Sequence, residues 1–414
     1  MATYIRLTDY KDSDSKEQGF FKSENRYEAK QDDFEKIPGK YIAYWLSQKT
    51  VQLFSDKGCI GDNVITREGM ATADNDRFLK YWFEVSLQNI GFNIKNNVES
   101  ITSQLKWFPY NKGGEFRKWY GNNEYVVDWE NDGFEVRNNK DENTGRIRSH
   151  NYNGEYGFKE GMTWAALSSS NISVRYSPVG FLFDSKGAMG FSENNIKYYI
   201  ALINSCIGMK FLEVLAPTMD FKVGDIIKIP LIESNISNIT NLVNLNINIS
   251  KEEWDSRETS WDFTKNELLK HKSDSKIETA YNNYCSYWKE KFYKLHANEE
   301  ELNRLFIDIY ELGDELTPDV ALKDITILKS ESIINDRGEL EFKADEIMKQ
   351  FISYAVGVMF GRYSLDKDGL QIANLGSEIL ISQMTDETKV SFPIDDDNVI
   401  PVLEDDYFSD DIAS

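Results

Sequence analysis

The spacing of apolar residues changes once along the 414-residue chain, and this change constrains the fold most. Between residues 41 and 190, short apolar runs such as 125–129 and 179–183 are broken by Gly, Asn and Asp, which is typical of strands joined by turns. From residue 196 on, apolar residues recur three or four positions apart through 196–215, 284–311 and 343–360, as on one face of a helix. We therefore expect an α+β fold: a mixed, strand- and loop-rich domain followed by a mainly helical region.

The remaining segments suggest where the domains divide. Residues 1–40 are polar and read as a connector that ends at Pro38-Gly39, and 224–232 reads as a strand with Pro230 near its end. Residues 235–250 hold six asparagines, which indicates either a linker or compositional drift. The expected divisions are 1–40 (connector), 41–235 (strand-rich domain), 236–298 (linker and helices) and 299–414 (acidic helical region).

Acidic residues are concentrated at one end of the chain. The net charge is −22, and residues 299–414 hold 28 acidic and 9 basic residues, which accounts for −19 of it. Residues 391–414 contain eight acids and no base, and the end from Asp395 onward is expected to be poorly ordered. The acidic region repels a phosphate backbone and is expected to contact protein or water, whereas the nearly neutral remainder can still present a basic face.

Several classes of protein and site are not supported by the sequence. No apolar run approaches the roughly 18–20 residues of a membrane span, and no apolar signal core is found, so we expect a cytoplasmic protein without a membrane partner. Three cysteines and three histidines lack the spacing of metal ligands, so no metal site is expected. Phosphate-binding glycine loops, the Gly-x-Ser-x-Gly elbow and His-Glu-x-x-His are absent, so we name no catalytic residue in this chain.

The most unusual stretch, 106–123, interleaves cations with aromatic residues. Lysines supply point charges for phosphates, arginine can bind guanine through two hydrogen bonds, asparagine can read adenine, and aromatic rings can stack. Two adjacent glycines let a backbone approach a ligand closely. The candidate DNA-contacting residues here are Lys106, Tyr110, Asn111, Lys112, Gly113, Gly114, Arg117 and Lys118. In the alternative interpretation the aromatic residues of this stretch form a core, and its cations extend outward to solvent.

Three shorter stretches offer further candidates for contact with DNA. Asn75 and Arg77 precede an apolar run, where they also fit a helix cap with acidic residues in its first turn. Arg146 and Arg148 lie in a turn-rich cationic segment that suits either a groove-contacting loop or an ordinary surface loop. Arg175 suits either a phosphate contact or a place in a structural turn around Pro178 and Gly180.

Taken together, these strings resemble the PglX family of adenine-specific DNA methyltransferases from BREX phage-defence systems, which have a layout similar to type IIG restriction–modification enzymes. The resemblance runs through almost the whole chain. Its most specific parts are the tryptophan-rich strings 106–122 and 254–263, and further matches lie at 34–39, 42–46, 72–78, 173–178, 201–205, 223–230, 300–310 and 353–366.

The resemblance implies sequence-specific recognition of double-stranded DNA, with a methyltransferase core or other BREX components as partners. Family members are much longer, and their methyltransferase domain carries a glycine-rich motif for S-adenosylmethionine and an Asn-Pro-Pro-Tyr catalytic motif. Neither motif occurs here, so the chain resembles the target-recognition domain and the start of the C-terminal region, without a cofactor of its own. The alternatives are a protein-interaction module, a truncated remnant that does not bind DNA, or a methyltransferase with an unrecognised cofactor site.

Overall fold

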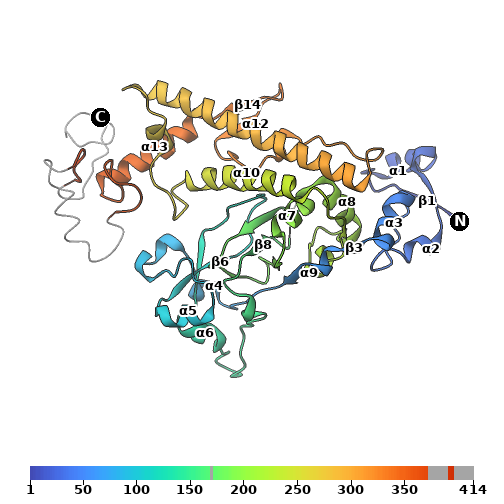
Figure 1. Ribbon diagram of the computed structural model, residues 1–414, viewed down its shortest axis with the longest axis horizontal. Helices are drawn as coiled ribbons and strands as arrows, with labels where there is room; N and C mark the ends of the chain where they lie inside the picture. Colours follow the sequence, from blue (N-terminus) through green and yellow to red (C-terminus); the bar gives the residue numbers. More distant parts are fainter. Residues whose placement is uncertain (168–170, 372–389, 396–414) are drawn as a thin grey trace.

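The computed structural model describes residues 1–167, 171–371 and 390–395. The molecule is elongated, with the N-terminal elements at one end (Figure 1). Two long helices, α10 (Ile236–Asp255) and α12 (Ile277–Tyr310), run side by side along a lobe built from strands. The junction between strands and helices therefore lies at the centre of the molecule.

The first 56 residues fold into strands and short helices, including the segment 1–40 that we expected to be a connector. Their elements are β1 (Ala2–Ile5), α1 (Ser13–Phe20), β2 (Arg26–Ala29), α2 (Gln31–Phe34) and α3 (Gln48–Asp56). β1 pairs antiparallel with β2. α1 begins with a capping box, because the Asp12 carboxylate accepts a hydrogen bond from the Ser15 N–H at 2.8 Å while the Asp12 N–H donates to Ser15 Oγ.

The strand lobe (residues 65–191) contains two four-stranded sheets. The strands of the first sheet are β5 (Leu79–Tyr81), β6 (Trp107–Asn111), β7 (Tyr125–Asp128) and β10 (Leu182–Phe183). Those of the second are β4 (Ile65–Arg67), β8 (Gly161–Trp164), β9 (Val174–Ser177) and β11 (Met189–Phe191). The orders are β10–β6–β7–β5 and β4–β11–β8–β9, and the only parallel neighbours in these two sheets are β10 and β6. The expected strand-rich character of this region is confirmed.

The first sheet is covered on both faces. On one face, Phe108 and Tyr110 of β6 are fully buried and pack with Trp129. On the other face, Val126 of β7 is fully buried and packs with Trp82. A strand buried on both sides needs a continuous apolar run rather than an alternating one. Short helices lie between the strands along the chain: α4 (Asn75–Phe78), α5 (Asn97–Ser103) and α6 (Glu130–Arg137).

The helical part (residues 196–359) packs against the second sheet through α7. Besides α10 and α12 its helices are α7 (Ile196–Asn204), α8 (Cys206–Leu215), α9 (Val223–Ile226), α11 (Glu267–Lys270) and α13 (Ala344–Met359). Two small antiparallel strand pairs complete it: β3 (Gly58–Cys59) with β12 (Pro230–Leu231), and β13 (Ser332–Ile334) with β14 (Leu340–Phe342). This arrangement confirms the α+β fold.

Two of the three expected helices are confirmed as single helices. The segment 284–311 lies almost wholly within α12, and 343–360 corresponds to α13. The segment 196–215 instead forms α7 and α8, which are bent by 74° relative to each other. The break falls at Ser205, which has an extended backbone and whose Oγ accepts a hydrogen bond from the Gly208 N–H at 3.3 Å. A residue that caps α8 in this way cannot continue the helix.

Two other predictions are wrong. Within 224–232 only Pro230–Leu231 is a strand, because Ile226 and Ile229, three positions apart, are both buried beside the helical turn α9. The segment 235–250 is not a linker but most of α10.

The cause of the second error is tertiary packing. Ile239, Val243 and Ile247 recur every four residues on the buried side of α10, which packs against α7 and α12. Asn246 on the same side is fully buried, and its Oδ1 accepts a hydrogen bond from Asn298 Nδ2 on α12 at 2.8 Å. Packing of this face outweighs the low helix propensity of asparagine. Most of the acidic end that we expected to be poorly ordered (396–414) lies outside the described residues.

Candidate nucleic-acid interface

The aromatic and cationic stretch 106–123 forms β6 and the loop that leads to β7, and several of its polar side chains point into the protein. The Tyr110 hydroxyl donates a hydrogen bond to the Asp184 carboxylate at 3.1 Å, and Lys112 Nζ lies 2.6 Å from the same oxygen. Asn111 Nδ2 donates to Ser177 Oγ at 2.8 Å and is buried. These three side chains therefore join β6 to the segments around β9 and β10.

Arg117 and Lys118 reach across to the helical part. Arg117 Nη2 lies 2.6 Å from a carboxylate oxygen of Glu253 on α10, and its guanidinium lies over the Trp254 ring at 5.1 Å. Lys118 Nζ lies 2.8 Å from a carboxylate oxygen of Glu299 on α12. Both cations are largely buried, so they do not extend outward to solvent as the alternative interpretation expects. The other half of that interpretation holds for Phe108 and Trp119, which are buried in the core.

Glu253 is the centre of a buried ionic network. Besides Arg117 it binds Arg257 Nη2 at 2.7 Å and accepts a hydrogen bond from the Leu328 N–H at 2.9 Å. Burial raises the pKa of Glu253, but the two guanidinium groups outweigh burial and lower it to about 2. Arg257 also pairs with Glu331, so the network extends toward β13.

Gly113 and Gly114 form a tight turn around Arg175. Both glycines have positive φ values, 100° and 105°, which side-chain-bearing residues rarely adopt. The Gly113 carbonyl accepts a hydrogen bond from Arg175 Nη2 at 2.9 Å, and a Cβ on Gly114 would lie 2.7 Å from Asn122 Nδ2. Arg175 is almost completely buried, and burial together with the charge of Arg117 lowers its pKa to about 10.

Lys106, Asn75 and Arg77 lie nearer the surface. Lys106 is 44% exposed and pairs with Asp128 at 3.3 Å. The cap interpretation of the second stretch is confirmed, because the Asp74 carboxylate accepts a hydrogen bond from the Arg77 N–H at 3.1 Å at the start of α4. The Arg77 guanidinium is 53% exposed and pairs with the equally exposed Glu135, and Asn75 is exposed.

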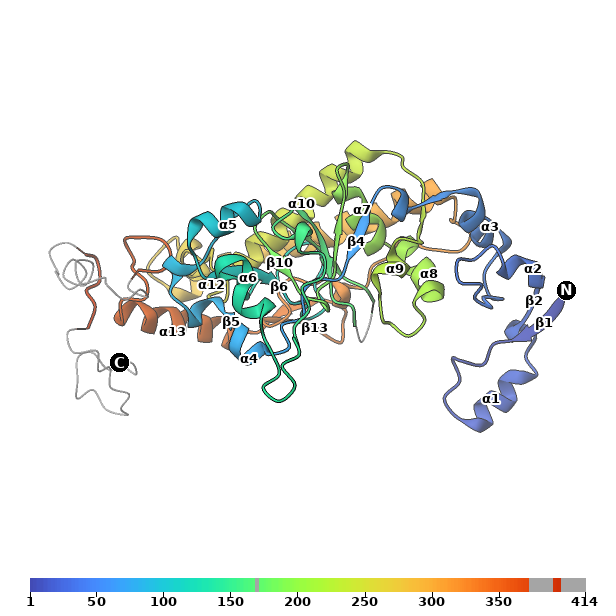
Figure 2. The ribbon, with the colours of Figure 1, turned by 90° about the horizontal axis from the view of Figure 1, so that it is seen from below.

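Arg146 and Arg148 lie on a basic hairpin (residues 139–150) that projects from the strand lobe (Figures 1 and 2). The hairpin is closed by a bridge between Lys140 and Ile147, and a Cβ on Gly145 would meet nothing within 4 Å. Lys140, Arg146 and Arg148 are exposed and, among the described residues, form no ion pair. The hairpin therefore presents three exposed cations, and because it also contains Asp141 and Glu142 its formal net charge is +1.

The structure thus divides the sequence candidates into two groups. The hairpin cations lie beside α4, because Arg148 Nη2 donates to the Ala73 carbonyl and Asn139 Nδ2 to the Thr72 carbonyl. The outward group contains Asn75, Arg77, Arg146 and Arg148. The inward group contains Tyr110, Asn111, Gly113, Arg117, Lys118 and Arg175. The other three candidates belong to neither group: Gly114 lies in the turn beside Gly113, and Lys106 and Lys112 are partly exposed and paired with carboxylates.

Sequence reasoning missed the partners of the inward group and one outward cation. Glu253 and Glu299 lie 136 and 181 positions from Arg117 and Lys118, so nothing local pointed to them. The excess of acid beyond residue 298 indicated that carboxylates were available, and Glu299 belongs to that excess. Lys140 begins the basic hairpin but was not among the candidates.

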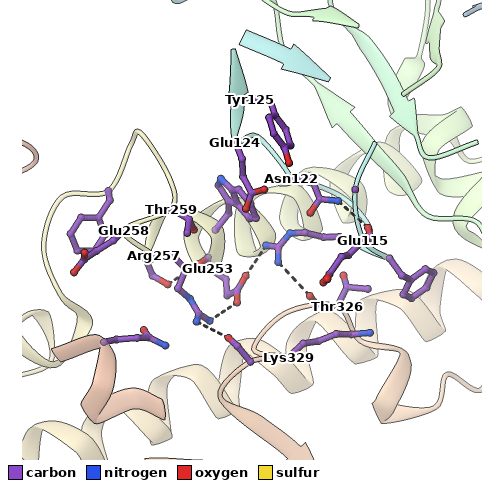
Figure 3. A pocket seen from close by; sticks show the side chains of 18 of the residues that line it. Glu115, Asn122, Glu124, Tyr125, Glu253, Arg257, Glu258, Thr259, Thr326 and Lys329 are labelled. Carbon is purple, nitrogen blue, oxygen red and sulfur yellow. Dashed lines mark hydrogen bonds and ion pairs between the residues drawn. The ribbon is translucent and has the colours of Figure 1, made fainter. Parts of the chain in front are cut away.

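A cavity of about 700 Å³ opens where the strand lobe meets the helical part (Figure 3). The lobe contributes Gly113, Gly114, Glu124 and Tyr125, and the helical part contributes Glu253, Arg257, Glu258 and Lys329. A second cavity of about 530 Å³ shares Glu258 and Thr259 with the first, and Trp82, Phe83 and Tyr363 line it.

The Gly113-Gly114 turn does not match the kind of cofactor site that a glycine-rich motif builds. Such a site needs a strand, a glycine loop and a helix whose N-terminus faces the ligand. β6 and Gly113-Gly114 are followed by β7, with no helix between them. In the described part of the chain, no three His, Cys, Asp or Glu side chains gather in a way that could hold a metal ion.

The similarity of the chain to known proteins is extensive but partial. It is 41% identical over 424 aligned positions to the adenine-specific methyltransferase PglX of Lacticaseibacillus casei (strain Zhang), a match that covers 99% of this chain and 34% of PglX. The chain is a partial homologue of the BREX adenine-specific methyltransferases. It is also 34% identical to the adenine-specific methyltransferase BrxX of Escherichia coli O9:H4 (strain HS), over 93% of this chain and 31% of BrxX. The chain spans about a third of the length of these curated relatives, and no protein-family model matches it.

Membrane-spanning helices are not found in the ranges that the structure describes. No single helix there is long and apolar enough to cross a membrane. The pair α7 and α8 meets those criteria together, with the 74° bend between them.

Proposed function

We propose that this chain is the DNA target-recognition part of an adenine-N6 DNA methyltransferase that belongs to a BREX phage-defence system. The observation that carries the proposal is the similarity to PglX and BrxX along nearly the whole chain, combined with the absence of both motifs of the methyltransferase core. Core and S-adenosylmethionine site then belong to a part of the enzyme outside this sequence. That part must extrude the adenine, because N6 cannot reach a catalytic pocket from within the base stack.

In this proposal the outward group contacts double-stranded DNA. The basic hairpin projects from the lobe, and α4 supplies Asn75 and Arg77 beside it. Exposed arginines can reach phosphates in either groove or a guanine edge in the major groove. Of the two acids in the hairpin, Asp141 accepts hydrogen bonds from the Thr144 N–H and hydroxyl, whereas Glu142 is exposed and lowers the net positive charge of the hairpin.

The inward group has a different role in the proposal. The ion pairs of Arg117 and Lys118 attach the loop 113–120 to α10 and α12, and Arg175 donates a hydrogen bond to the Gly113 carbonyl within this loop. In the proposal these side chains position the strand lobe and do not contact DNA. This assignment revises the expectation that Arg117 binds guanine. Substituting Arg117 should then lower the stability of the protein and leave the preferred DNA site unchanged.

The test is a fluorescence-anisotropy titration of the chain with random-sequence duplex DNA at about 50 and 200 mM salt. We expect affinity to fall steeply with salt, and Arg146→Ala with Arg148→Ala to weaken binding and reduce the salt slope by about 2, since each phosphate contact contributes about 0.9. The matched control is Arg304→Ala with Arg337→Ala, which removes two exposed arginines from the helical part.

Two outcomes would count against the proposal. Equal losses in the hairpin and control variants would remove the hairpin from the interface. No binding of the unaltered chain at low salt, together with co-purification of a protein partner, would favour the protein-interaction module over a DNA-recognition domain.

A further inference from the structure

Unbalanced carboxylates line the cavity between the strand lobe and the helical part. Its buried cations are already paired, because Arg117 and Arg257 both bind Glu253. Glu124 is half-buried, and among the described residues its carboxylate forms no ion pair and accepts no hydrogen bond (Figure 3). Burial and the nearby Glu115 raise the pKa of Glu124, and the charge of Arg117 only partly offsets this rise.

Glu258, which both cavities share, is also incompletely satisfied. Its Oε1 is buried and accepts no hydrogen bond. Its Oε2 accepts a hydrogen bond from the Ser353 hydroxyl at 3.2 Å and lies 3.6 Å from Arg362 Nη1. Burial raises the pKa of Glu258. A buried acceptor without a partner costs free energy that a donor from a ligand would recover.

Three stacked rings continue the wall beside Glu124. Tyr125, which lines the cavity, stacks on Tyr81 with ring centres 4.7 Å apart, and Tyr81 stacks on Phe83 at 5.3 Å with only 4° between the planes. Tyr81 and Phe83 are 38% and 58% exposed. Aromatic faces carry a partial negative charge, so they attract cations and do not attract phosphates.

One cation of the cavity wall is unpaired among the described residues, so the cavity is positively charged on one side and negatively charged on the other. Lys329 lies over the Phe116 ring at 5.0 Å and forms no ion pair among the residues described. In Figure 3 it lies on the opposite side of the cavity from Glu124 and Tyr125. A positively charged ligand would therefore be held at the side of Glu124 and repelled from the side of Lys329.

We propose that this cavity binds a small organic cation, an alkylammonium or guanidinium compound, between the Tyr125 wall and the carboxylates of Glu124 and Glu258. The volume of about 700 Å³ lies within the range of small-molecule sites. The ligand contacts both sides of the junction that Arg117 and Glu253 hold together, so it stabilises the attachment of the strand lobe to the helices. The site goes beyond DNA recognition, because its carboxylates repel a phosphate backbone.

The test uses isothermal titration calorimetry of the whole chain with agmatine at about pH 7, where exposed carboxylates are ionised. Uncharged 1,5-pentanediol serves as the comparison ligand. We expect agmatine to bind and the diol not to bind. Glu124→Gln should weaken agmatine binding about tenfold or more, since a hydrogen bond to a charged group is lost. Lys329→Gln should strengthen binding, because it removes a like charge.

The matched control is Glu290→Gln, which neutralises an exposed carboxylate on α12 away from the cavity. Among the described residues the Glu124 carboxylate forms no hydrogen bond or ion pair, so its variant is expected to keep its melting temperature, which is measured alongside. Absence of binding, or equal affinities of the Glu124→Gln and Glu290→Gln variants, would overturn the proposal. The hairpin variant Arg146→Ala with Arg148→Ala should still bind agmatine, so failure of DNA recognition and failure of this site are distinguishable.

Discussion

At the scale of single residues, Glu253 holds more of the molecule together than any local feature suggests. Its carboxylate binds Arg117 from the strand lobe and Arg257 from its own helix, and it accepts the Leu328 N–H from the segment before β13. Three separate parts of the chain thus meet at one buried charge. Removing that charge would leave two buried guanidinium groups short of a partner, which is costly.

This arrangement predicts acid-dependent stability. The pKa of Glu253 is lowered from 4.5 to about 2 in the folded state, so its ionic contribution is present above pH 4.5 and is lost as the pH falls toward 2. We expect a loss on the order of 3 kcal/mol across that window from this group. Urea unfolding at a series of pH values measures it, and the Glu253→Gln variant should lack this component. A variant with the same pH profile as the unaltered chain would refute the assignment.

At the scale of elements, the bend between α7 and α8 depends on a glycine. Gly208 lies in the first turn of α8, where a Cβ would come within 2.4 Å of the Leu202 carbonyl oxygen and 2.7 Å of that of Ile203. The backbone of α7 can therefore approach α8 closely only because no side chain intervenes. Gly224 in α9 provides the contrast, since a Cβ there would meet nothing within 4 Å.

Substitution by alanine should have different effects on stability at these two helical glycines. Gly208→Ala is expected to destabilise the protein by about 1–3 kcal/mol, because backbone must move to make room. Gly224→Ala should leave stability unchanged or raise it by up to about 1 kcal/mol, as helix propensity alone predicts. Thermal and urea unfolding of both variants provide the measurement. Equal effects would mean that the close approach at the bend does not limit the fold.

At the scale of the whole molecule, the strand lobe and the helical part are joined by buried polar contacts. Trp82 Nε1 donates to the Thr259 carbonyl at 2.8 Å, and Trp119 Nε1 donates to the Glu299 carboxylate at 2.7 Å. The pairs of Arg117 and Lys118 lie between these two contacts along the chain. Separating the two parts would break all of these hydrogen bonds and ion pairs at once. We therefore expect the strand lobe and the helical part to unfold together.

Two spectroscopic probes can test this cooperativity. Five of the nine tryptophans lie in the strand lobe, whereas helices dominate far-ultraviolet circular dichroism. We expect coincident urea transitions by tryptophan fluorescence and circular dichroism. Arg117→Met combined with Lys118→Met should separate them, with fluorescence changing first. Two separate transitions in the unaltered chain would contradict the coupling.

The charged candidates show why sequence reasoning reached the fold more readily than the site. The basic hairpin is local, so Arg146 and Arg148 could be found from neighbouring turn residues. The environment of Arg117 depends on Glu253 and Trp254, which the sequence places more than 130 positions away. A stretch rich in cations and rings looks the same in sequence whether it faces DNA or other helices.

The sequence by itself determined the α+β class, the positions of α12 and α13, the helical character of the segment that forms α7 and α8, and the resemblance to the adenine-specific methyltransferases. Those properties follow from local spacing of apolar residues and from long specific strings, both of which are written along the chain. Only the tertiary structure decided that the asparagine-rich segment is a helix and that Arg117, Lys118 and Arg175 are buried. The physical reason is that burial and ion pairing depend on which distant residues meet, and here packing brings carboxylates of α10 and α12 to the cations of the strand lobe.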